Sequence, residues 1–332
     1  MKRSMFGNPH LFNEYGHVGG LYTFLTTIRM LLKELNPQKV ILVWDGENSG
    51  KLRYDKYKAY KANRESKNWH NKIVLTEKEI SYQNKMKESE LWQRVRVQEY
   101  AEDLFLRQIE VVETEADDII AHYCSEYCKE EDIFIYSNDR DYVQLIDYDN
   151  ISVYLADKKQ ILDKFNSVLY LEHHYSNACL IKTICGCNSD NIKGIEGVQL
   201  PTLLKYFPEL ANKRLTIDYI VNKAKELQEE RIISKKKPLK CFDAIINGSE
   251  IYKINLFLVD LKNPLLSDNA KEEMRIISEG VLNPSERTSK NLLKLMNEDK
   301  FFIIYSGDFV QYVTPFFGVI QEEKKYFEKN SH

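Results

Sequence analysis

Acidic residues gather where the predicted strands of this sequence end. Asp45 follows the apolar run 40–44, and Asp139 and Asp141 follow the apolar run 133–136. Two further groups complete the set: Glu115, Asp117 and Asp118, and then Asp190 ahead of a glycine-rich turn. Crowded carboxylates cost several kcal/mol each unless cations neutralise them, and hard divalent cations prefer oxygen ligands. The pattern therefore predicts a Mg²⁺ or Mn²⁺ site that could attack phosphodiesters.

A basic segment lies between the first two acidic groups. Residues 51–67 carry seven Lys or Arg against two acids, interleaved with Tyr54, Tyr57 and Tyr60. Basic side chains neutralise phosphates and aromatic rings offer stacking faces, a combination that suits single-stranded nucleic acid. The same composition also fits a solvated helix face. The net charge of −3 does not separate these alternatives, because the basic residues are concentrated here.

The order of apolar residues predicts the elements that position these groups. Residues 19–35 have the spacing of an amphipathic helix that ends at Asn36-Pro37. The run 40–44 is typical of a buried parallel strand, and ligands bind at the carboxyl ends of such strands. We expect a long helix from about Leu75 to Ile109, whose polar first half projects from the body. Further strands are expected at 109–112, 133–136 and 151–155, with a helix at 117–128.

Helical patterns dominate beyond about residue 165, and no further strands are expected there. Residues 189–198 predict a tight, glycine-bounded turn ahead of a new helix, whose backbone N–H groups could hold a phosphate. A plain corner is the competing interpretation. The charged end, residues 322–332, is expected to fray. These patterns give two domains, residues 1–164 and 165–332.

Composition sets broad limits on the class of protein. With 332 residues, 43% of them hydrophobic, the chain has the composition of a globular protein of about two domains. The sequence contains no signal peptide or membrane-spanning run, so we expect a cytoplasmic protein without membrane contact. Six cysteines fit a reducing compartment. A zinc site at His173, His174, Cys179, Cys185 and Cys187 is disfavoured because paired Cys-x2-Cys knuckles are absent.

Together these motifs resemble the flap endonuclease and 5′-3′ exonuclease family, most of all its bacteriophage members, including phage ribonuclease H-type primer-removing enzymes. The resemblance rests on four segments in order, with a fifth, weaker one at 254–261. They are Val43-Trp44-Asp45 with the Tyr-Lys-Ala-Tyr-Lys-Ala-Asn-Arg run at 57–64, Glu115-Ala116-Asp117-Asp118, Ser137-Asn138-Asp139-Arg140-Asp141 with Gln144-Leu145, and residues 189–197. Each is common alone, but four in order are a strong signal.

The resemblance implies an α/β fold: a PIN-like nuclease domain with a mostly parallel sheet and a helical arch at about 64–90, then a helical-three-turn-helix domain. It implies two Mg²⁺ about 4 Å apart, with Mn²⁺ as a substitute, that activate water and stabilise the leaving oxygen. The implied metal ligands are Asp45, Glu115, Asp117, Asp118, Asp139, Asp141 and Asp190. Lys61 and Arg64 are the implied catalytic clamp on the phosphate. Arg53, Tyr60, Lys193, Gly194 and Gly197 are the implied DNA contacts, with Tyr60 stacking beside a displaced base and K⁺ at the hairpin.

The implied activity is a 5′-3′ exonuclease and flap endonuclease that removes 5′ flaps and RNA primers in phage DNA replication. Its partners would be DNA with a 5′ flap or a single-stranded 5′ end and RNA–DNA hybrids, with a phage single-strand binding protein or sliding clamp as recruiter. We expect a monomer in the host cytoplasm. Neither the preference for RNA or DNA flaps nor the balance of exonuclease and endonuclease action follows from the sequence.

Two departures from the family pattern bear on activity. The family begins with a strand that ends in a metal-binding Asp, whereas the residues ahead of helix 19–35 contain no such strand and Glu14 is the nearest acid. We therefore expect the first strand to be missing. In addition, Cys187 stands where the family has an Asp, and a thiol is a poor ligand for a hard cation. These departures leave two alternatives: a weakened protein that binds flaps or branched DNA, and a PIN-type ribonuclease.

Overall fold

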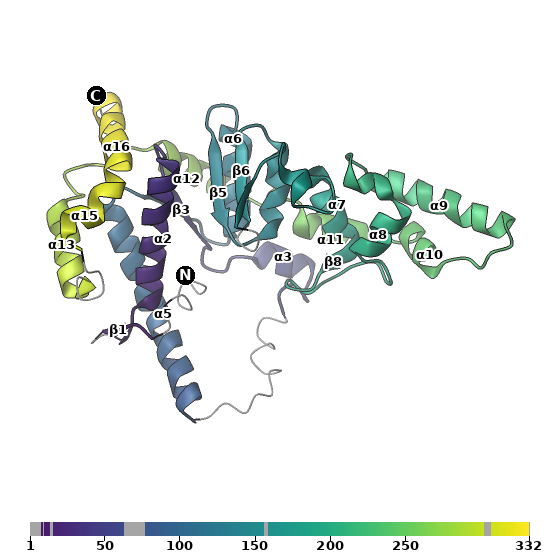
Figure 1. Cartoon of the computed structure of the whole chain (residues 1–332), viewed down its shortest axis with the longest axis horizontal. Coiled ribbons are helices and arrows are strands. Elements are labelled where there is room, and N and C mark those ends of the chain that lie inside the picture. Colours follow the sequence, from purple (N-terminus) through teal and green to yellow (C-terminus); the bar gives the residue numbers. More distant parts are fainter. Residues whose placement is uncertain are drawn as a thin grey trace. The chain divides into compact units, whose positions relative to one another are not determined.

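The computed structural model describes residues 8, 10–13, 16–62, 77–155, 159–301 and 307–331, and most of its helices are labelled in Figure 1. Contacts divide the chain into two compact units that are interleaved along the sequence. The first consists of Met1–Trp44, Ile73–Ile109 and Glu272–His332, and the second of Asp45–Lys72 and Glu110–Lys271. The expected division at residue 164 stays a prediction, because these units follow internal contacts and not sequence order.

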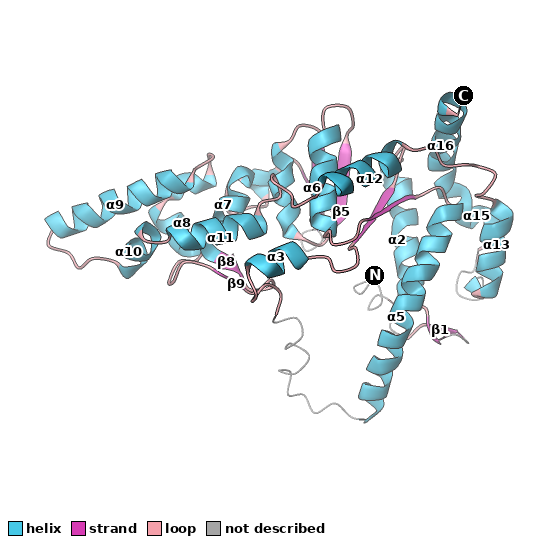
Figure 2. Ribbon diagram, turned by 180° about the vertical axis from the view of Figure 1, so that it is seen from behind, coloured by secondary structure: helices cyan, strands magenta, loops and turns pink. Residues whose placement is uncertain are grey.

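The first unit contains the predicted amphipathic helix. Helix α2 spans Gly19–Leu35 and buries Leu21, Leu25 and Leu32 against α5 (Glu77–Asp103). Helix α2 ends where Asn36 adopts a left-handed conformation with φ of 43°, because a short amide side chain tolerates this conformation. Figures 1 and 2 show α2 and α5 side by side. Strand β3 (Ile41–Trp44) confirms the predicted strand and hydrogen-bonds to β4 (Arg107–Glu110).

The end of α5 differs from the prediction. The expected helix reached Ile109, but α5 ends at Asp103, Phe105 has φ of 58°, and β4 begins at Arg107. The expected strand at 109–112 therefore starts two residues earlier. Ahead of α2, the described residues form a two-stranded hairpin, β1 (Phe12–Asn13) and β2 (Gly16–His17). Glu14 and most of the expected arch, residues 63–76, lie outside the described residues.

The C-terminal helices of the first unit contain the largest correction to the sequence analysis. They are α12 (Asp268–Glu279), α13 (Ser289–Glu298), α15 (Phe309–Val313), the 3-10 turn η5 (Thr314–Phe316) and α16 (Phe317–Asn330). The stretch expected to fray belongs mostly to α16. Glu323 is 3% exposed and pairs with the equally buried Arg107 through two hydrogen bonds of 2.8 and 2.6 Å. Arg107 also donates to the carbonyls of Ile277, Ser278 and Gly280 at the end of α12.

The second unit contains a three-stranded sheet. Strand β5 (Ile133–Ser137) runs parallel to β6 (Ile151–Leu155), and β7 (Gln160–Leu162) adds an antiparallel edge. Helix α6 (Ala116–Tyr127) and the 3-10 helix η1 (Arg140–Asp147) pack on each other beside it. The predicted strands β5 and β6 and helix α6 are confirmed. The α/β fold class predicted from the resemblance is confirmed with them.

The rest of the second unit is mostly helical, as predicted, and Figure 2 shows it in cyan. Its helices are α3 (Lys51–Lys56), α7 (Ala178–Cys185), α8 (Leu200–Tyr206), α9 (Ile217–Ile233), α10 (Lys240–Ile246) and α11 (Ser249–Val259). Three short 3-10 turns join them, η2 (Ser167–Leu169), η3 (Tyr175–Asn177) and η4 (Pro208–Ala211). A two-stranded hairpin, β8 (Gly186–Cys187) and β9 (Ile192–Lys193), follows α7, where no strands were expected. Gly186 has φ of 74°, and a Cβ there would lie 2.4 Å from Gly194 N, so the hairpin requires glycine.

None of the helices in the described part of the chain is long and apolar enough to cross a membrane.

Candidate active site

Four of the seven predicted acids line one pocket of the second unit. They are Asp117, Asp139, Asp141 and Asp190, with Arg53, Tyr60, Lys61 and Lys182 completing the polar lining. Asp117 lies in the first turn of α6, and Asp139 and Asp141 lie where β5 gives way to η1. Asp190 comes from the turn between β8 and β9. The sheet edge and the hairpin thus bring together acids that are far apart in the sequence.

Backbone hydrogen bonds fix the two acids after β5. The Asp139 carboxylate accepts from Asp141 N at 2.9 Å, and Asp139 N donates to Ser137 Oγ at 3.1 Å. Asp139 thereby caps η1, in the way that Asp side chains cap helix starts generally. The local sequence Ser-Asn-Asp-Arg-Asp therefore orients the Asp139 carboxylate at the end of the strand.

Burial raises the pKa of two pocket carboxylates, those of Asp117 and Asp141. It lifts the pKa of Asp117 to about 7, although the Tyr142 hydroxyl donates to Asp117 Oδ1 at 2.5 Å and opposes the shift; the charge of Asp139 adds to it. Burial also raises the pKa of Asp141, against the opposing effect of Lys182. Like charges in a low-dielectric pocket disfavour ionisation. These carboxylates would gain from a further cation.

Lys182 is a functional candidate that the sequence analysis missed. Its ammonium donates to Asp141 Oδ2 and, at 3.4 Å, to Asp190 Oδ2. Burial alone would lower the pKa of Lys182, but the two carboxylates outweigh burial and raise it. The sequence did contain a signal for Lys182, since it is the one charged residue in the mostly apolar helix α7. Tyr142, which was also missed, directly follows Asp141 in the sequence.

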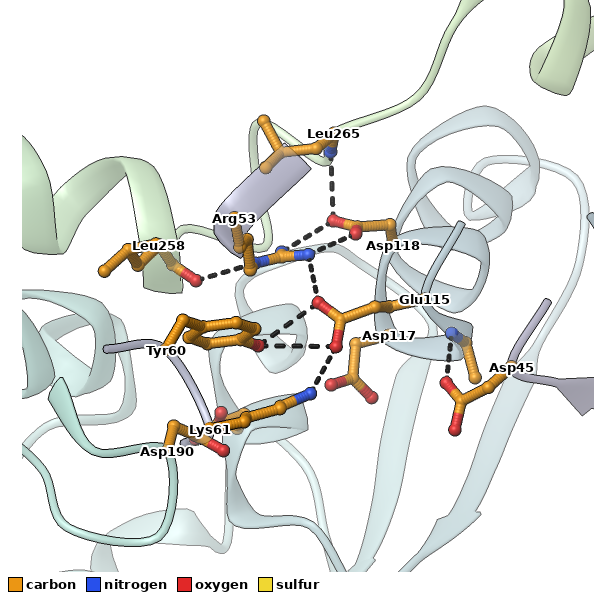
Figure 3. A network of polar contacts seen from close by, with 12 residues as sticks. Asp45, Arg53, Tyr60, Lys61, Glu115, Asp117, Asp118, Asp190, Leu258 and Leu265 are labelled. Atoms are coloured by element: carbon orange, nitrogen blue, oxygen red, sulfur yellow. Dashed lines mark hydrogen bonds and ion pairs between the residues drawn. The ribbon is translucent and has the colours of Figure 1, made fainter. Parts of the chain in front are cut away.

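A second group of polar side chains lies around Arg53, and Figure 3 shows it from close by. The Arg53 guanidinium donates to Glu115 at 2.6 Å and to both oxygens of Asp118 at 2.5 and 2.8 Å. Glu115 also accepts from the Tyr60 hydroxyl at 3.1 Å and from the Lys61 ammonium. Burial would raise the pKa of Glu115, but Lys61 and Arg53 outweigh burial and lower it. These inner acids are neutralised by the protein itself.

The surroundings of the inner group speak against three predicted roles. Arg53 is 4% exposed and paired with carboxylates, an arrangement that leaves its guanidinium little access to DNA. The Tyr60 ring is 8% exposed and packs with Ile192 and Leu258, so it cannot stack beside a displaced base in this arrangement. Asp118 is 1% exposed and both its oxygens accept from Arg53, which speaks against direct contact with a metal, and its predicted role stays a prediction.

Of the remaining predicted residues, Asp45, Lys193, Gly194 and Gly197 lie in the described part of the chain. Asp45 Oδ1 accepts from Ala116 N at 2.9 Å, which places its charge at the start of α6. Lys193 is exposed on β9, and Gly197 has φ of 73° with open space at its Cβ position. Gly194 is tightly enclosed, since a Cβ there would lie 2.2 Å from Cys185. Arg64 lies outside the described residues. The predicted roles of Lys61, Lys193 and the two glycines stay predictions.

The pocket has the donor chemistry that a hard divalent cation requires, because its acids supply only carboxylate oxygens. In the described residues, however, no three acidic, His or Cys side chains already surround one point. Lys182 bridges Asp141 and Asp190, and the Cys187 thiol donates to Asp190 Oδ2 at 3.2 Å. The carboxylates fit a divalent metal in type and location, and side-chain rotation would be needed to ligate one.

Comparison with known proteins points the same way as this geometry. A sequence model of the family described as 5′-3′ exonuclease, N-terminal resolvase-like domain, matches residues 1–171. A 5′-3′ exonuclease of Mycoplasmopsis pulmonis is 28% identical over 234 residues, which are 65% of this chain and 69% of that protein. A 5′-3′ exonuclease of Halalkalibacterium halodurans is 27% identical over 209 residues, 58% of this chain and 60% of that protein.

Solved structures share the fold. Bacteriophage T5 5′-exonuclease with bound divalent zinc ions has a TM-score of 0.59 at 18% identity, covering 90% of this chain and 94% of that one. Bacteriophage T5 flap endonuclease, in a pseudo-enzyme-product complex with DNA and metal ions, has a TM-score of 0.57 at 20% identity, covering 83% and 91%. The α/β fold and its acidic pocket define a resolvase-like nuclease. The chain belongs to the 5′-3′ exonuclease family, a family of phosphodiester hydrolases.

Proposed function

We propose that this protein is a structure-specific, divalent-metal-dependent 5′ nuclease that hydrolyses the phosphodiesters of 5′ flaps and RNA primers in phage DNA replication. The observation that carries the proposal is the pocket in which Asp117, Asp139, Asp141 and Asp190 lie beside Lys61 and Lys182. Carboxylates that hold cations, next to ammonium groups that bind phosphate, are the parts that phosphodiester hydrolysis requires. Mg²⁺ is the proposed metal, with Mn²⁺ as a substitute.

Each polar residue of the pocket would have a separate role in hydrolysis. When bound, the metal ions would supply Lewis-acid stabilisation and a lowered pKa for the attacking water. The four pocket carboxylates would hold the ions. Lys61, whose ammonium already lies at the pocket wall, would bind the scissile phosphate and offset the charge that develops on it. Arg64 would assist Lys61.

The hairpin between α7 and α8 would hold the duplex part of the substrate. Lys193 is exposed there and can neutralise a phosphate. The backbone turn around Gly194 and Gly197 offers N–H groups that contact phosphates without reading bases, and K⁺ is the proposed ion at this turn. Such contacts position DNA without sequence preference. Substrate choice would then come from the free 5′ end and the flap junction.

The test compares the purified protein with Asp139→Asn on a labelled 5′-flap duplex, with and without Mg²⁺. We expect cleavage near the junction that depends on Mg²⁺ and falls by on the order of 10³-fold in the variant. DNA binding in the absence of Mg²⁺ should be nearly unchanged, because Asp139 would contact metal and not phosphate. Asp149→Asn is the matched control, since Asp149 is an exposed acid paired with Lys164. Equal cleavage by wild type and Asp139→Asn would refute the proposed site.

Cys187 favours one alternative, a weakened protein that binds flaps or branched DNA. The Cys187 thiol occupies an oxygen of Asp190 that a metal could otherwise use. If the wild type binds the flap duplex tightly but does not cleave it with Mg²⁺ or Mn²⁺, this alternative is correct. Cleavage of single-stranded RNA in preference to every flap would instead identify a PIN-type ribonuclease.

A further inference from the structure

The buried guanidinium of Arg53 connects three parts of the second unit. Its Nε donates to the carbonyl of Leu258 at 2.9 Å, near the end of α11. Its two terminal nitrogens reach Glu115, the residue that precedes α6, and Asp118 in the first turn of that helix. Figure 3 shows these hydrogen bonds radiating from the one side chain. A planar guanidinium binds several acceptors in a fixed geometry, which an ammonium cannot reproduce.

Asp118 serves as the counter-ion of Arg53. Asp118 Oδ2 accepts from Arg53, and Oδ1 accepts from Arg53 and also from Leu265 N at 2.9 Å. With 1% of its surface exposed, the carboxylate is closed to solvent. A buried ion pair is tolerated when its hydrogen-bonding groups are satisfied in this way. The charge of Arg53 is therefore anchored on the side away from the pocket.

The segment 258–265 forms the support behind this pair. Arg53 binds its start at Leu258, and Asp118 binds its end at Leu265. Between these points, Gln144 of η1 donates to Val259 O at 3.0 Å and accepts from Leu261 N at 3.2 Å. Because η1 also begins with the pocket acids Asp139 and Asp141, one segment sets the positions of the inner and the pocket acids together.

On its other side, Arg53 acts through Glu115. One oxygen of Glu115 accepts from Arg53, and the other accepts from the Lys61 ammonium. The group has no net charge, because two cations, Arg53 and Lys61, face two carboxylates, Glu115 and Asp118. Lys61 has φ of 54°, and its N–H donates to the carbonyl of Asp190 at 2.8 Å. The backbone of Lys61 is thus fixed to the hairpin and its ammonium is fixed to Glu115.

We propose that Arg53 is the positioning residue of this active site, which fixes the Glu115 carboxylate and, through it, the Lys61 ammonium at the pocket wall. The proposal rests on the proposed function, because it assigns Lys61 to the phosphate. Arg53 would contact neither substrate nor metal. The competing explanation is that Arg53 only stabilises the fold. If so, a variant that regains stability without Arg53 should also regain activity, whereas a positioning role predicts that activity stays low.

The first variant is Arg53→Lys, which keeps the charge but loses the fork of hydrogen bonds. We expect the single-turnover rate constant for cleavage to fall by about 100-fold, the loss typical of a misplaced catalytic group. The Kd for flap DNA without Mg²⁺ should be unchanged.

The second variant is the double substitution Arg53→Met with Asp118→Asn, which removes both charges of the buried pair. Its thermal midpoint should return close to wild type while kcat stays low. Arg275→Met, at an exposed Arg paired with Glu272, is the control.

Recovery of wild-type kcat in the double variant, or wild-type kcat in Arg53→Lys, would overturn the proposal. If one variant does not fold, the other decides. Mn²⁺ binding measured by electron paramagnetic resonance gives a readout without turnover. We expect weaker binding in both variants, because a Lys61 ammonium released from Glu115 would compete with the ion for the carboxylates of the same pocket. If the wild type binds Mn²⁺ but cleaves no substrate, the proposed function fails. Arg53 is then judged on Mn²⁺ binding alone, and unchanged binding in both variants would overturn its positioning role.

Discussion

The acids of the pocket and the acids around Arg53 have the same chemistry and opposite surroundings. Asp117 and Asp118 are neighbours on α6, yet Asp117 lines the pocket while Asp118 is sealed between Arg53 and Leu265 N. Burial raises the pKa of Asp117 to about 7, whereas the cations beside Glu115 lower its pKa. The difference shows which carboxylates the protein neutralises itself. In the pocket, Lys182 pairs with Asp141 and Asp190, yet the pKa of Asp141 stays raised, so an external cation would still relieve charge there.

The largest expected effect tests the link between the two regions. Lys61→Ala should lower the single-turnover rate by about 100-fold or more, because the phosphate would lose its ammonium partner. Affinity for flap DNA should change little. Lys58→Ala is the matched control, since Lys58 is exposed, lies three residues earlier and pairs with Asp55. A normal rate for Lys61→Ala would remove Lys61 from the catalytic group.

For the inner acids, we expect a stability effect. Asp118→Asn leaves Arg53 with one carboxylate and should lower the free energy of unfolding by about 3 kcal/mol, as breaking a buried ion pair does. Chemical denaturation measures this change. Mn²⁺ affinity should stay near wild type, because Arg53 already holds both oxygens of Asp118. Asp55→Asn, at an exposed acid, should cost almost nothing. Strong loss of Mn²⁺ binding in folded Asp118→Asn would return Asp118 to the ligand set.

Asp117→Asn, at the residue next to Asp118, should raise the free energy of unfolding instead of lowering it. In metal-free protein, folded Asp117 keeps its proton up to about pH 7, whereas the unfolded chain releases it near pH 4. The free energy of unfolding therefore falls as the pH rises through this interval. Asp117→Asn removes this pH-dependent loss of stability. In EDTA, which removes metal ions, the variant should be more stable than wild type by about 2 to 4 kcal/mol at about pH 8, and by less than half of that at about pH 5. Thermal melts in EDTA at both pH values would show no such gain if Asp117 were already ionised.

The smallest effect concerns Cys187. Cys187→Asp adds a carboxylate beside Asp190 and should lower the Mg²⁺ concentration for half-maximal cleavage severalfold, because ligand charge raises the affinity of oxygen sites. Asn188→Asp adds the same charge at an exposed neighbour and should have less effect. A Mg²⁺ titration of cleavage separates the two. Equal half-saturation in wild type and Cys187→Asp would mean that this position does not contact the metal.

Local pattern was enough to predict most of the elements of this fold. The apolar periodicity of α2 and the runs that form β3, β5 and β6 depend on neighbours in the sequence. Grouping the acids at strand ends also followed from a general property of α/β sheets. Helix α16 was wrongly expected to fray because it is rich in charged residues. One of them, Glu323, is buried, but its partner Arg107 lies 216 residues away in the sequence.

The direction of individual side chains could not be predicted. Within the basic run 51–67, composition does not reveal that Arg53 turns inward, because its partners Glu115, Asp118 and Leu258 lie between 62 and 205 residues away. The same holds for Lys182, which 41 residues separate from Asp141. Such pairings depend on tertiary packing, and a sequence motif gives only the residue types available for them.

The pairing of Arg107 with Glu323 sets a limit on shortening the chain. A premature stop or a protease cut before α16 would remove the carboxylate and leave a guanidinium buried in β4 with only backbone carbonyls as partners. An uncompensated buried charge is strongly destabilising. Fragments that keep every acid of the pocket but end before residue 323 should therefore be recovered as aggregates, and a nonsense mutation in the last helix should be as damaging as one in the acidic motifs.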